Sequence, residues 1–237
     1  MGHIIFICAS ADRNRHLLKI AILGTGEVGS HLASSLVDLG HVVMIGSRTA
    51  ENASATEWAR LKGPRASHGT FADAAAFGEL VFNCTAGAIS LEALRMAGSQ
   101  NLKGKVLVDV SNPLDFSKGM PPTLTICNTD SVGEQIQRAF PETKVVKALN
   151  TMRHEIMTNP ALVPGSHDVF ICGNDPEAKA EVTRILKEWF GWKNVIDLGD
   201  IAGSRGLEMV LPLWLRLFRV YNRALFNFKV VRQVPDA

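Results

Sequence analysis

The chain of 237 residues is 46% hydrophobic and 20% charged, a composition that provides a sizeable core and excludes a disordered protein. Its 25 Lys and Arg residues nearly balance 23 Asp and Glu residues, so charge gives no reason to expect nucleic acid or an anionic membrane as a partner. The apolar runs at 4–9 and 210–218 are too short to span a bilayer, so we expect no stable membrane insertion.

Short apolar strands and helices alternate along most of the chain. Residues 1–18 precede the first motif and are treated as an N-terminal extension. Strands are expected at 19–24, 41–48, 66–68, 80–84, 105–110 and 144–149, and helices at 27–40, 49–63, 71–77, 90–97 and 131–140. Strands at 168–172 and 195–198 flank a helix at 176–190, and helical segments are expected from 202 to about 231.

This alternation predicts an α/β fold, a Rossmann-type doubly wound parallel sheet with a small C-terminal helical extension. The strands show little polar alternation, which indicates a sheet covered by helices on both faces. Prolines and a glycine cluster near 150–164 and suggest a boundary there. We therefore expect a Rossmann domain at 19–155 and a C-terminal α/β and helical part at 156–237 that packs on it.

A glycine-rich turn joins the first predicted strand to the first helix. It has the spacing GxGxxG and consists of Gly24, Thr25, Gly26, Glu27, Val28 and Gly29. In this context the first glycine permits a tight turn, the second lets a pyrophosphate approach the backbone, and the third lets helix and strand pack closely. The amides and partial positive charge of the helix N-terminus favour phosphate. The turn predicts a dinucleotide site, and a turn without a ligand is the alternative.

The end of the second strand indicates which dinucleotide binds. NAD sites usually carry Asp or Glu there to bind the ribose 2′-hydroxyl, whereas this chain has Ser47, Arg48 and Thr49. Arg48 can pair with a 2′-phosphate through two hydrogen bonds, and the hydroxyls can donate to it. We therefore expect NADP(H), which makes 19–155 an NADP-binding domain. The alternative is that Arg48 is a solvated arginine and that Ser47 caps the next helix.

Four segments, in a fixed order, resemble a known family. They are GTGEVGSHLASSLVDLGHVVMIGSR at 24–48, VVKALNTM at 145–152, DVFICGNDPEAK at 168–179 and DLGDIAGSRGLEMVLPLWL at 197–215. Together they resemble the coenzyme F420-dependent NADP oxidoreductases. They are also similar to the reductase domain of the STEAP metalloreductases. Two further segments, SNPLDFSKGMPP at 111–122 and NTDSVGEQIQRAFP at 128–141, look most similar to bacterial members known only as dinucleotide-binding proteins or reductases. The resemblance implies a Rossmann fold, NADP(H), and a small-molecule hydride acceptor such as the deazaflavin F420.

The nicotinamide is expected over the carboxyl ends of the strands, where three further loops arrive. Their candidate cofactor-binding residues are Thr85, Ala86, Gly87, Asn112, Pro113, Asn150 and Thr151. The resemblance places the last two near the stacked rings, and the alternative for each polar residue is a strand-end cap. No catalytic acid or base is expected, because direct hydride transfer needs two rings held in contact and water excluded.

Ser204 and Arg205 are candidate substrate-binding residues. They begin a predicted helix, where amides and a guanidinium can hold an anionic or polar partner ring. The alternative is a helix cap and an ion pair between Arg205 and Glu208. The histidines and cysteines show no ligand spacing, so no metal site is predicted. Cys84 and Cys172 lie in apolar runs and are expected to be buried free thiols, which fits a reducing cytoplasm.

The C-terminal run at 211–231 is rich in Leu, Phe and Trp with interspersed arginines. We expect its apolar stripe to pack against a second subunit in a homodimer, and a helix lying on a membrane surface is the alternative. Trp189, Trp192 and Trp214 are expected in the core or at this interface. His41, which precedes the second strand, is expected at the surface.

Three functions remain in competition. The first, which we expect, is an NADP(H)-dependent oxidoreductase that transfers hydride between the nicotinamide and a flavin or deazaflavin, with coenzyme F420, FMN or FAD as co-substrate. The second is an NADPH-dependent reductase of a small carbonyl or imine compound. It needs a proton donor near the ring, for which Lys147 and Tyr221 are poor candidates. The third is a non-catalytic NADP(H)-binding redox sensor.

Overall fold

The computed structural model describes residues 17–222 and 225–233. Its strands are β1 (Lys19–Leu23), β2 (Val42–Ser47), β3 (Ala66–Thr70), β4 (Leu80–Asn83), β5 (Val106–Asp109), β6 (Leu114–Asp115), β7 (Thr123–Leu124), β8 (Lys144–Ala148), β9 (Asp168–Gly173) and β10 (Asn194–Asp197). Its α-helices are α1 (Glu27–Asp38), α2 (Ala53–Lys62), α3 (Phe71–Phe77), α4 (Gly87–Ala97), α5 (Ser99–Leu102), α6 (Val132–Ala139), α7 (His154–Thr158), α8 (Pro176–Glu188), α9 (Ser204–Met209) and α10 (Leu211–Tyr221). The expected N-terminal extension lies almost wholly outside the described residues.

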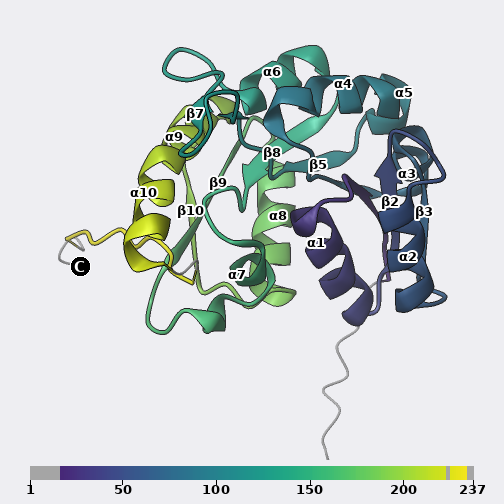
Figure 1. Ribbon diagram of the computed structural model, residues 1–237, viewed down its shortest axis with the longest axis horizontal. Coiled ribbons are helices and arrows are strands. Elements are labelled where there is room, and N and C mark those ends of the chain that lie inside the picture. The colour runs from purple at the N-terminus through teal and green to yellow at the C-terminus, as the bar shows by residue number, and fades with distance from the viewer. Residues whose placement is uncertain (1–16, 223–224, 234–237) are drawn as a thin grey trace, which may run out of the picture.

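The main sheet has eight strands within the described residues, in the order β10-β9-β8-β5-β4-β1-β2-β3. Figure 1 shows β3 toward one end of the molecule and α9 and α10 at the other. From β3 to β8 all neighbouring strands are parallel, and their order is that of a doubly wound dinucleotide-binding fold. The predicted fold class is confirmed with one difference, because β9 runs antiparallel to β8 while β10 is parallel to β9. Two strands from the C-terminal part therefore extend the same sheet.

The sheet is covered by helices on both faces, and the residues of β1 show why its strands are apolar throughout. Ile20 and Ile22 are fully buried in a cluster with side chains of α1, α2, α7 and α8. Ala21 and Leu23 are fully buried on the other face, among side chains of α3, α4, α5 and α6. Because both alternating sets of side chains meet a helix layer, neither set is polar.

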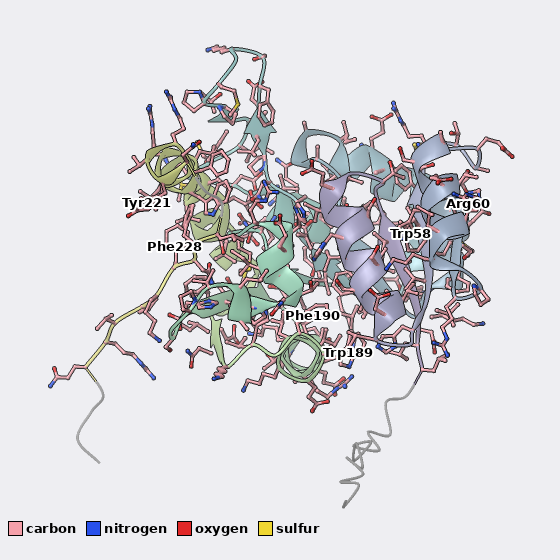
Figure 2. All side chains as sticks on the ribbon, turned by 60° about the horizontal axis from the view of Figure 1, so that its bottom comes forward. Trp58, Arg60, Trp189, Phe190, Tyr221 and Phe228 are labelled. Atoms are coloured by element: carbon pink, nitrogen blue, oxygen red, sulfur yellow. The ribbon has the colours of Figure 1, made fainter. Side chains whose placement is uncertain are left out.

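The end of the chain corrects one prediction. The sequence pattern predicts helical structure to about residue 231, but α10 ends at Tyr221, and Asn222 adopts a left-handed conformation with φ 45°. Residues 225–233 contain no helix. Their backbone instead meets the first residue of β9, since Asp168 donates its amide to the Phe228 carbonyl (3.0 Å) and accepts the Val230 amide. Figure 2 labels Phe228 on this segment, and the ring of the nearby Phe226 lies 6.0 Å from that of Tyr221 at the end of α10.

The placement of His41 was also wrong, whereas two of the three tryptophans are core residues as expected. His41 is only 1% exposed, its ring lies 4.3 Å from that of Trp189, and its Nδ1 accepts the Leu18 amide. Trp189 and Trp192 are buried, and Trp192 donates to the Met157 carbonyl (2.9 Å). A histidine can be buried at a strand start when its ring nitrogen binds a backbone amide and its face meets an aromatic ring.

No helix in the described ranges is long and apolar enough to cross a membrane.

The predicted burial of the thiols is confirmed for Cys172, whereas Cys84 is half-buried and Cys127 is exposed. Burial raises the pKa of the Cys172 thiol to about 11, so this side chain is a neutral thiol at neutral pH.

The antiparallel contact between β8 and β9 predicts a sharp contrast between two glycines. A Cβ on Gly173 would lie 2.6 Å from the Val145 carbonyl oxygen, whereas a Cβ on Gly206 of α9 would meet nothing within 4 Å. Gly173→Ala should therefore cost about 1–3 kcal/mol of unfolding free energy. Gly206→Ala should be neutral or add up to about 1 kcal/mol, since alanine favours helix. Urea unfolding measures the free energy of unfolding of both variants. Equal stabilities would contradict the close contact between β8 and β9 at Gly173.

Candidate functional site

Of the three glycines in the turn between β1 and α1, one has free space where a side chain would stand. Gly24 has φ 120°, and a Cβ there would stand 2.8 Å from the Cys84 carbonyl oxygen. A Cβ on Gly29 would overlap the Gly24 carbonyl oxygen, so its absence lets α1 approach β1. A Cβ on Gly26, in contrast, would meet no atom within 4 Å. The turn thus presents free space at its middle glycine, in front of the α1 N-terminus, where Glu27 and Val28 follow.

A cleft of about 510 Å³ lies at the carboxyl edge of the sheet. Three of the predicted groups line it: Gly24 to Gly26, Ser47 to Thr49, and Thr85 with Ala86. The lining also includes Asn52, Phe71 and Ile89, which the sequence reasoning did not single out. The structure therefore brings together the loops after β1, β2 and β4, which are adjacent in the sheet although far apart in sequence.

Arg48 is the cationic side chain of this cleft. It is exposed and makes no ion pair with any residue the structure describes. The neighbouring Ser47 is 5% exposed and donates its hydroxyl to the Thr49 carbonyl, so it shapes the turn. Ser47 does not cap α2, because Asn52 does, accepting the Ala55 amide at 3.0 Å. The part of the alternative that gave Ser47 a capping role is therefore wrong, while its other part, a solvated Arg48, agrees with the exposure of this side chain at the cleft.

Thr85 belongs to a buried polar network at the ends of β4 and β5. Its hydroxyl donates to Asn83 Oδ1 (2.7 Å), and Asn83 in turn donates to Asp109 Oδ1 (2.8 Å) and Ser90 Oγ (3.1 Å). Ser111 donates both its amide and its hydroxyl to Asp109 Oδ1. These bonds fix the two loops with respect to each other.

Asn112 and Asn150 meet across the ends of β5 and β8. Asn150 Nδ2 donates to Asn112 Oδ1 (2.9 Å) and to the Leu207 carbonyl of α9 (3.0 Å), while Asn112 Nδ2 donates to the Asn150 carbonyl (2.8 Å). Asn150 is 3% exposed, and its Oδ1 is buried with no partner among the described residues. The pair holds the loops and α9 together and leaves one buried acceptor free.

The loop after β4 touches the same region through Gly87. Its amide donates to the Asn112 carbonyl at 3.0 Å, and a Cβ on Gly87 would overlap that oxygen and the nitrogen of Pro113. Thr151, which follows Asn150, is 2% exposed. The candidate residues Gly87, Asn112, Pro113, Asn150 and Thr151 therefore lie around one junction beside the cleft, and none of them lines the cleft itself.

A buried lysine was not predicted to matter at this edge. Lys147 is 0% exposed and donates to Asp109 Oδ2 (2.8 Å), Glu208 Oε1 (2.8 Å) and the Ser111 carbonyl (2.6 Å). Burial alone would lower the pKa of Lys147, but Asp109 and Glu208 raise it above its usual value. The signal in the sequence was a lysine inside a strand buried on both faces, which requires a buried partner.

The start of α9 packs tightly on α6. Ser204 is fully buried beside Cys172, with 3.4 Å between Oγ and Sγ, and its hydroxyl occupies the space that a side chain on Gly133 would fill. Arg205 donates two hydrogen bonds to Glu134 (2.8 and 2.6 Å). The suggested pairing of Arg205 with Glu208 is therefore wrong, because Glu208 is drawn to Lys147 and away from the surface. Among the described residues no group of His, Cys, Asp or Glu could hold a metal ion.

The Arg205 pair predicts a pH-dependent stability. The hydrogen bonds from Arg205 lower the pKa of Glu134 below its ordinary value. A depressed carboxyl pKa adds stability that is present above the unfolded pKa, about 4.3, and is lost as pH falls through the folded value. Glu134→Gln should therefore be destabilised by about 1–2 kcal/mol at pH 7, and the loss should shrink between about pH 5 and pH 3. Urea unfolding across this range checks it, and a pH-independent loss would contradict it.

Comparisons with known proteins agree with this architecture. A family model described as NADP oxidoreductase, coenzyme F420-dependent, matches residues 19–113. The chain is 33% identical over 209 residues to the F420-dependent NADP reductase of Methanocaldococcus jannaschii, covering 84% of this chain and 92% of that protein. It is 29% identical to the metalloreductase STEAP3 of Rattus norvegicus over 83% of this chain but only 38% of that longer protein.

A solved structure shows the same fold at higher identity. The crystal structure of a candidate F420-dependent NADP reductase from Arthrobacter sp. FB24 is 53% identical, with a TM-score of 0.85, and the match covers 91% of this chain and all of that one. The resemblance seen in the sequence is thereby confirmed, and with it an NADP-dependent reductase. The protein belongs to the family of coenzyme F420-dependent NADP oxidoreductases.

Proposed function

We propose that the protein transfers hydride between NADP(H) and the deazaflavin coenzyme F420. The observation that carries the proposal is the cleft at the carboxyl edge, whose lining includes both Gly26, with open space around it, and Arg48, which makes no ion pair among the described residues. The names of the M. jannaschii and Arthrobacter relatives support F420 as the acceptor. FMN and FAD remain alternative acceptors that the same assay compares.

The cleft fits the adenosine half of NADP(H). The amides at the α1 N-terminus and the free space at Gly26 suit a pyrophosphate, since a helix start presents donors and a partial positive charge. Arg48 follows β2, where a ribose 2′-phosphate would arrive, and Ser47 and Thr49 beside it are uncharged. A guanidinium pairs with phosphate through two parallel hydrogen bonds. These residues would hold the cofactor and select the phosphorylated form.

The nicotinamide half fits the second set of strands, β4, β5 and β8. In doubly wound sheets each half binds one mononucleotide, so the ring would lie near Thr85, Asn112 and Asn150. Asn150 Oδ1, a buried acceptor with no partner among the described residues, would accept an amide or hydroxyl donor of the bound nucleotide. When bound, NADPH supplies the hydride. The protein's own part would be to orient the ring and exclude water, and the hydrogen bonds that hold the Asn112 and Asn150 loops together support this role.

Helix α9 forms the wall on the acceptor side of this proposal. Ser204 is enclosed between α6 and β9 and is committed to packing. Arg205 keeps 39% of its side chain exposed while it pairs with Glu134, so it is the member of the predicted pair that can still contact a polar or anionic acceptor. A hydride acceptor therefore has a charged contact available beside the predicted ring position.

Reduction of a small carbonyl or imine is less well supported. That reaction needs a positioned proton donor near the ring. Lys147 has its three protons committed to Asp109, Glu208 and a carbonyl, and it is fully buried. Tyr221 ends α10 and is 57% exposed. A redox sensor without turnover would bind NADP(H) equally well, and only turnover distinguishes it from the enzyme.

We also propose that the protein is a homodimer formed through α10. Leu213, Val220 and Tyr221 of this helix are more than half exposed, and such apolar surface is usually covered by a partner. Multi-angle light scattering would show twice the monomer mass if this holds, and the monomer mass if it does not.

Arg48 provides the test of cofactor choice. Arg48→Ala should weaken NADP⁺ binding about ten- to hundredfold, because a charge-assisted pair with the 2′-phosphate is lost, and should change NAD⁺ binding by less than about twofold. Isothermal titration calorimetry measures both. Arg60→Ala is the matched control, since it removes an exposed arginine of α2 that pairs with Glu57. Equal weakening of both nucleotides by Arg48→Ala would refute the assignment.

The acceptor is tested by turnover. Protein mixed with NADPH should bleach the visible absorbance of oxidised F420, and it should do so faster than it reduces FMN or FAD at the same concentration. A protein that binds NADPH but reduces none of the three would favour the sensor. Faster reduction of FMN or FAD would move the proposal to a flavin.

A further inference from the structure

Three buried ionic side chains, one lysine and two carboxylates, lie beneath the carboxyl ends of the strands. We call Lys147, Asp109 and Glu208 the Lys147 cluster. Each side chain is at most 1% exposed, so water and salt screen the cluster weakly. Its charge state can be derived from the hydrogen bonds alone, because a carboxylate that receives only donors carries no proton.

Asp109 receives only donors from the described residues. Its Oδ1 accepts the side-chain amide of Asn83 (2.8 Å), the amide of Ser111 (3.2 Å) and the hydroxyl of Ser111 (2.7 Å). Its Oδ2 accepts Lys147 Nζ (2.8 Å). Both oxygens therefore act as acceptors, and Asp109 is an ionised carboxylate.

Glu208, like Asp109, receives only hydrogen-bond donors from the described residues. Its Oε2 accepts the Val132 amide (2.9 Å), and its Oε1 accepts the Gly133 amide (3.2 Å) and Lys147 Nζ (2.8 Å). The two amides begin α6, and the partial positive charge of a helix start offsets part of the burial cost of this second carboxylate. One ammonium thus stands between two ionised carboxylates, and the cluster has a net charge of −1.

The cluster lies where the proposed function places the nicotinamide. Asp109 and Lys147 are paired in register at the carboxyl ends of β5 and β8. The loops that follow carry Asn112 and Asn150, which bond to each other and to α9. An oxidised nicotinamide ring carries a positive charge, whereas the reduced ring is neutral, because the hydride leaves with both electrons. A buried negative charge beside the ring distinguishes the two forms.

We propose that the Lys147 cluster favours the oxidised over the reduced nicotinamide in the bound state. Asp109 and Glu208 are then residues that determine specificity for the redox state of the cofactor, and Lys147 sets the size of the charge. The consequence is a bound NADPH that is a stronger hydride donor than NADPH in water. This inference rests on the proposed function, since it needs the ring over β5 and β8.

Three variants change the charge in different directions. Glu208→Gln brings the cluster to 0. Lys147→Met brings it to −2 when the titration is run at a pH high enough to keep both buried carboxylates ionised without their cation, and the double variant Lys147→Met/Glu208→Gln then returns it to −1 with the bridge removed. The quantity to measure is the ratio of the Kd for NADP⁺ to the Kd for NADPH, by calorimetry. Because each ratio compares two nucleotides on one protein, a partly unfolded sample cancels from it.

The Kd ratio is expected to change in opposite directions in the two single variants. The ratio should rise about three- to tenfold in Glu208→Gln, fall by a similar factor in Lys147→Met, and stay near the wild-type value in the double variant. Asp175→Asn is the control. It neutralises another carboxylate that pairs with a lysine, Lys144, but at the opposite, amino end of β8, and should leave the ratio unchanged.

A purely structural cluster gives a different pattern. Shifts of the same sign in both single variants, or an unchanged ratio in all of them, would overturn the inference. If Lys147→Met does not fold, Glu208→Gln and Asp109→Asn decide, since both must raise the ratio. A wild-type protein that binds neither nucleotide would instead refute the proposed function, while normal binding with unshifted ratios would refute only the inference.

Discussion

The ammonium of Lys147 is the interaction on which the carboxyl edge depends. A lysine in a strand buried on both faces is costly unless its charge is matched and its protons are bonded. Here the match comes from Asp109 on the adjacent strand and from Glu208, which belongs to α9. Since Glu208 also receives the first amides of α6, one charge fixes the positions of two strands and two helices. The loops around the proposed nicotinamide position are built on this junction.

The two halves of the proposed cofactor site differ in how far the protein has already arranged them. On the adenosine side, Gly26 leaves open space and Arg48 has no ion pair among the described residues, so ligand atoms complete the contacts. On the nicotinamide side, Asn112 and Asn150 are bonded to each other, and Asn150 Oδ1 is a buried acceptor with no partner in the part of the chain that the structure describes. Affinity would therefore come mainly from the phosphates, and ring orientation from a rigid junction.

Local patterns predicted the fold because they encode local constraints. The glycine turn, the apolar strands and the helix periods require only neighbours in sequence, and the helix at Phe71–Phe77 was predicted at its observed bounds. The antiparallel β9 was not predicted, since strand direction depends on the connection through α7 and the loop after it. The end of α10 was missed because Asn222 stops a run that is otherwise apolar and helical in pattern. The proposed division at residue 155 remains a prediction.

The site shows the same division between local and distant information. Gly24 to Gly26 and Ser47 to Thr49 were found because motif and chemistry lie together in sequence. The pairs Arg205 with Glu134 and Lys147 with Glu208 join residues 71 and 61 positions apart, and single-sequence patterns contain no such pairing.

The most direct test is a crystal structure of the protein with NADP⁺. The account predicts the 2′-phosphate against the Arg48 guanidinium and the nicotinamide over β5 and β8. A nucleotide whose adenosine end lies elsewhere would contradict it.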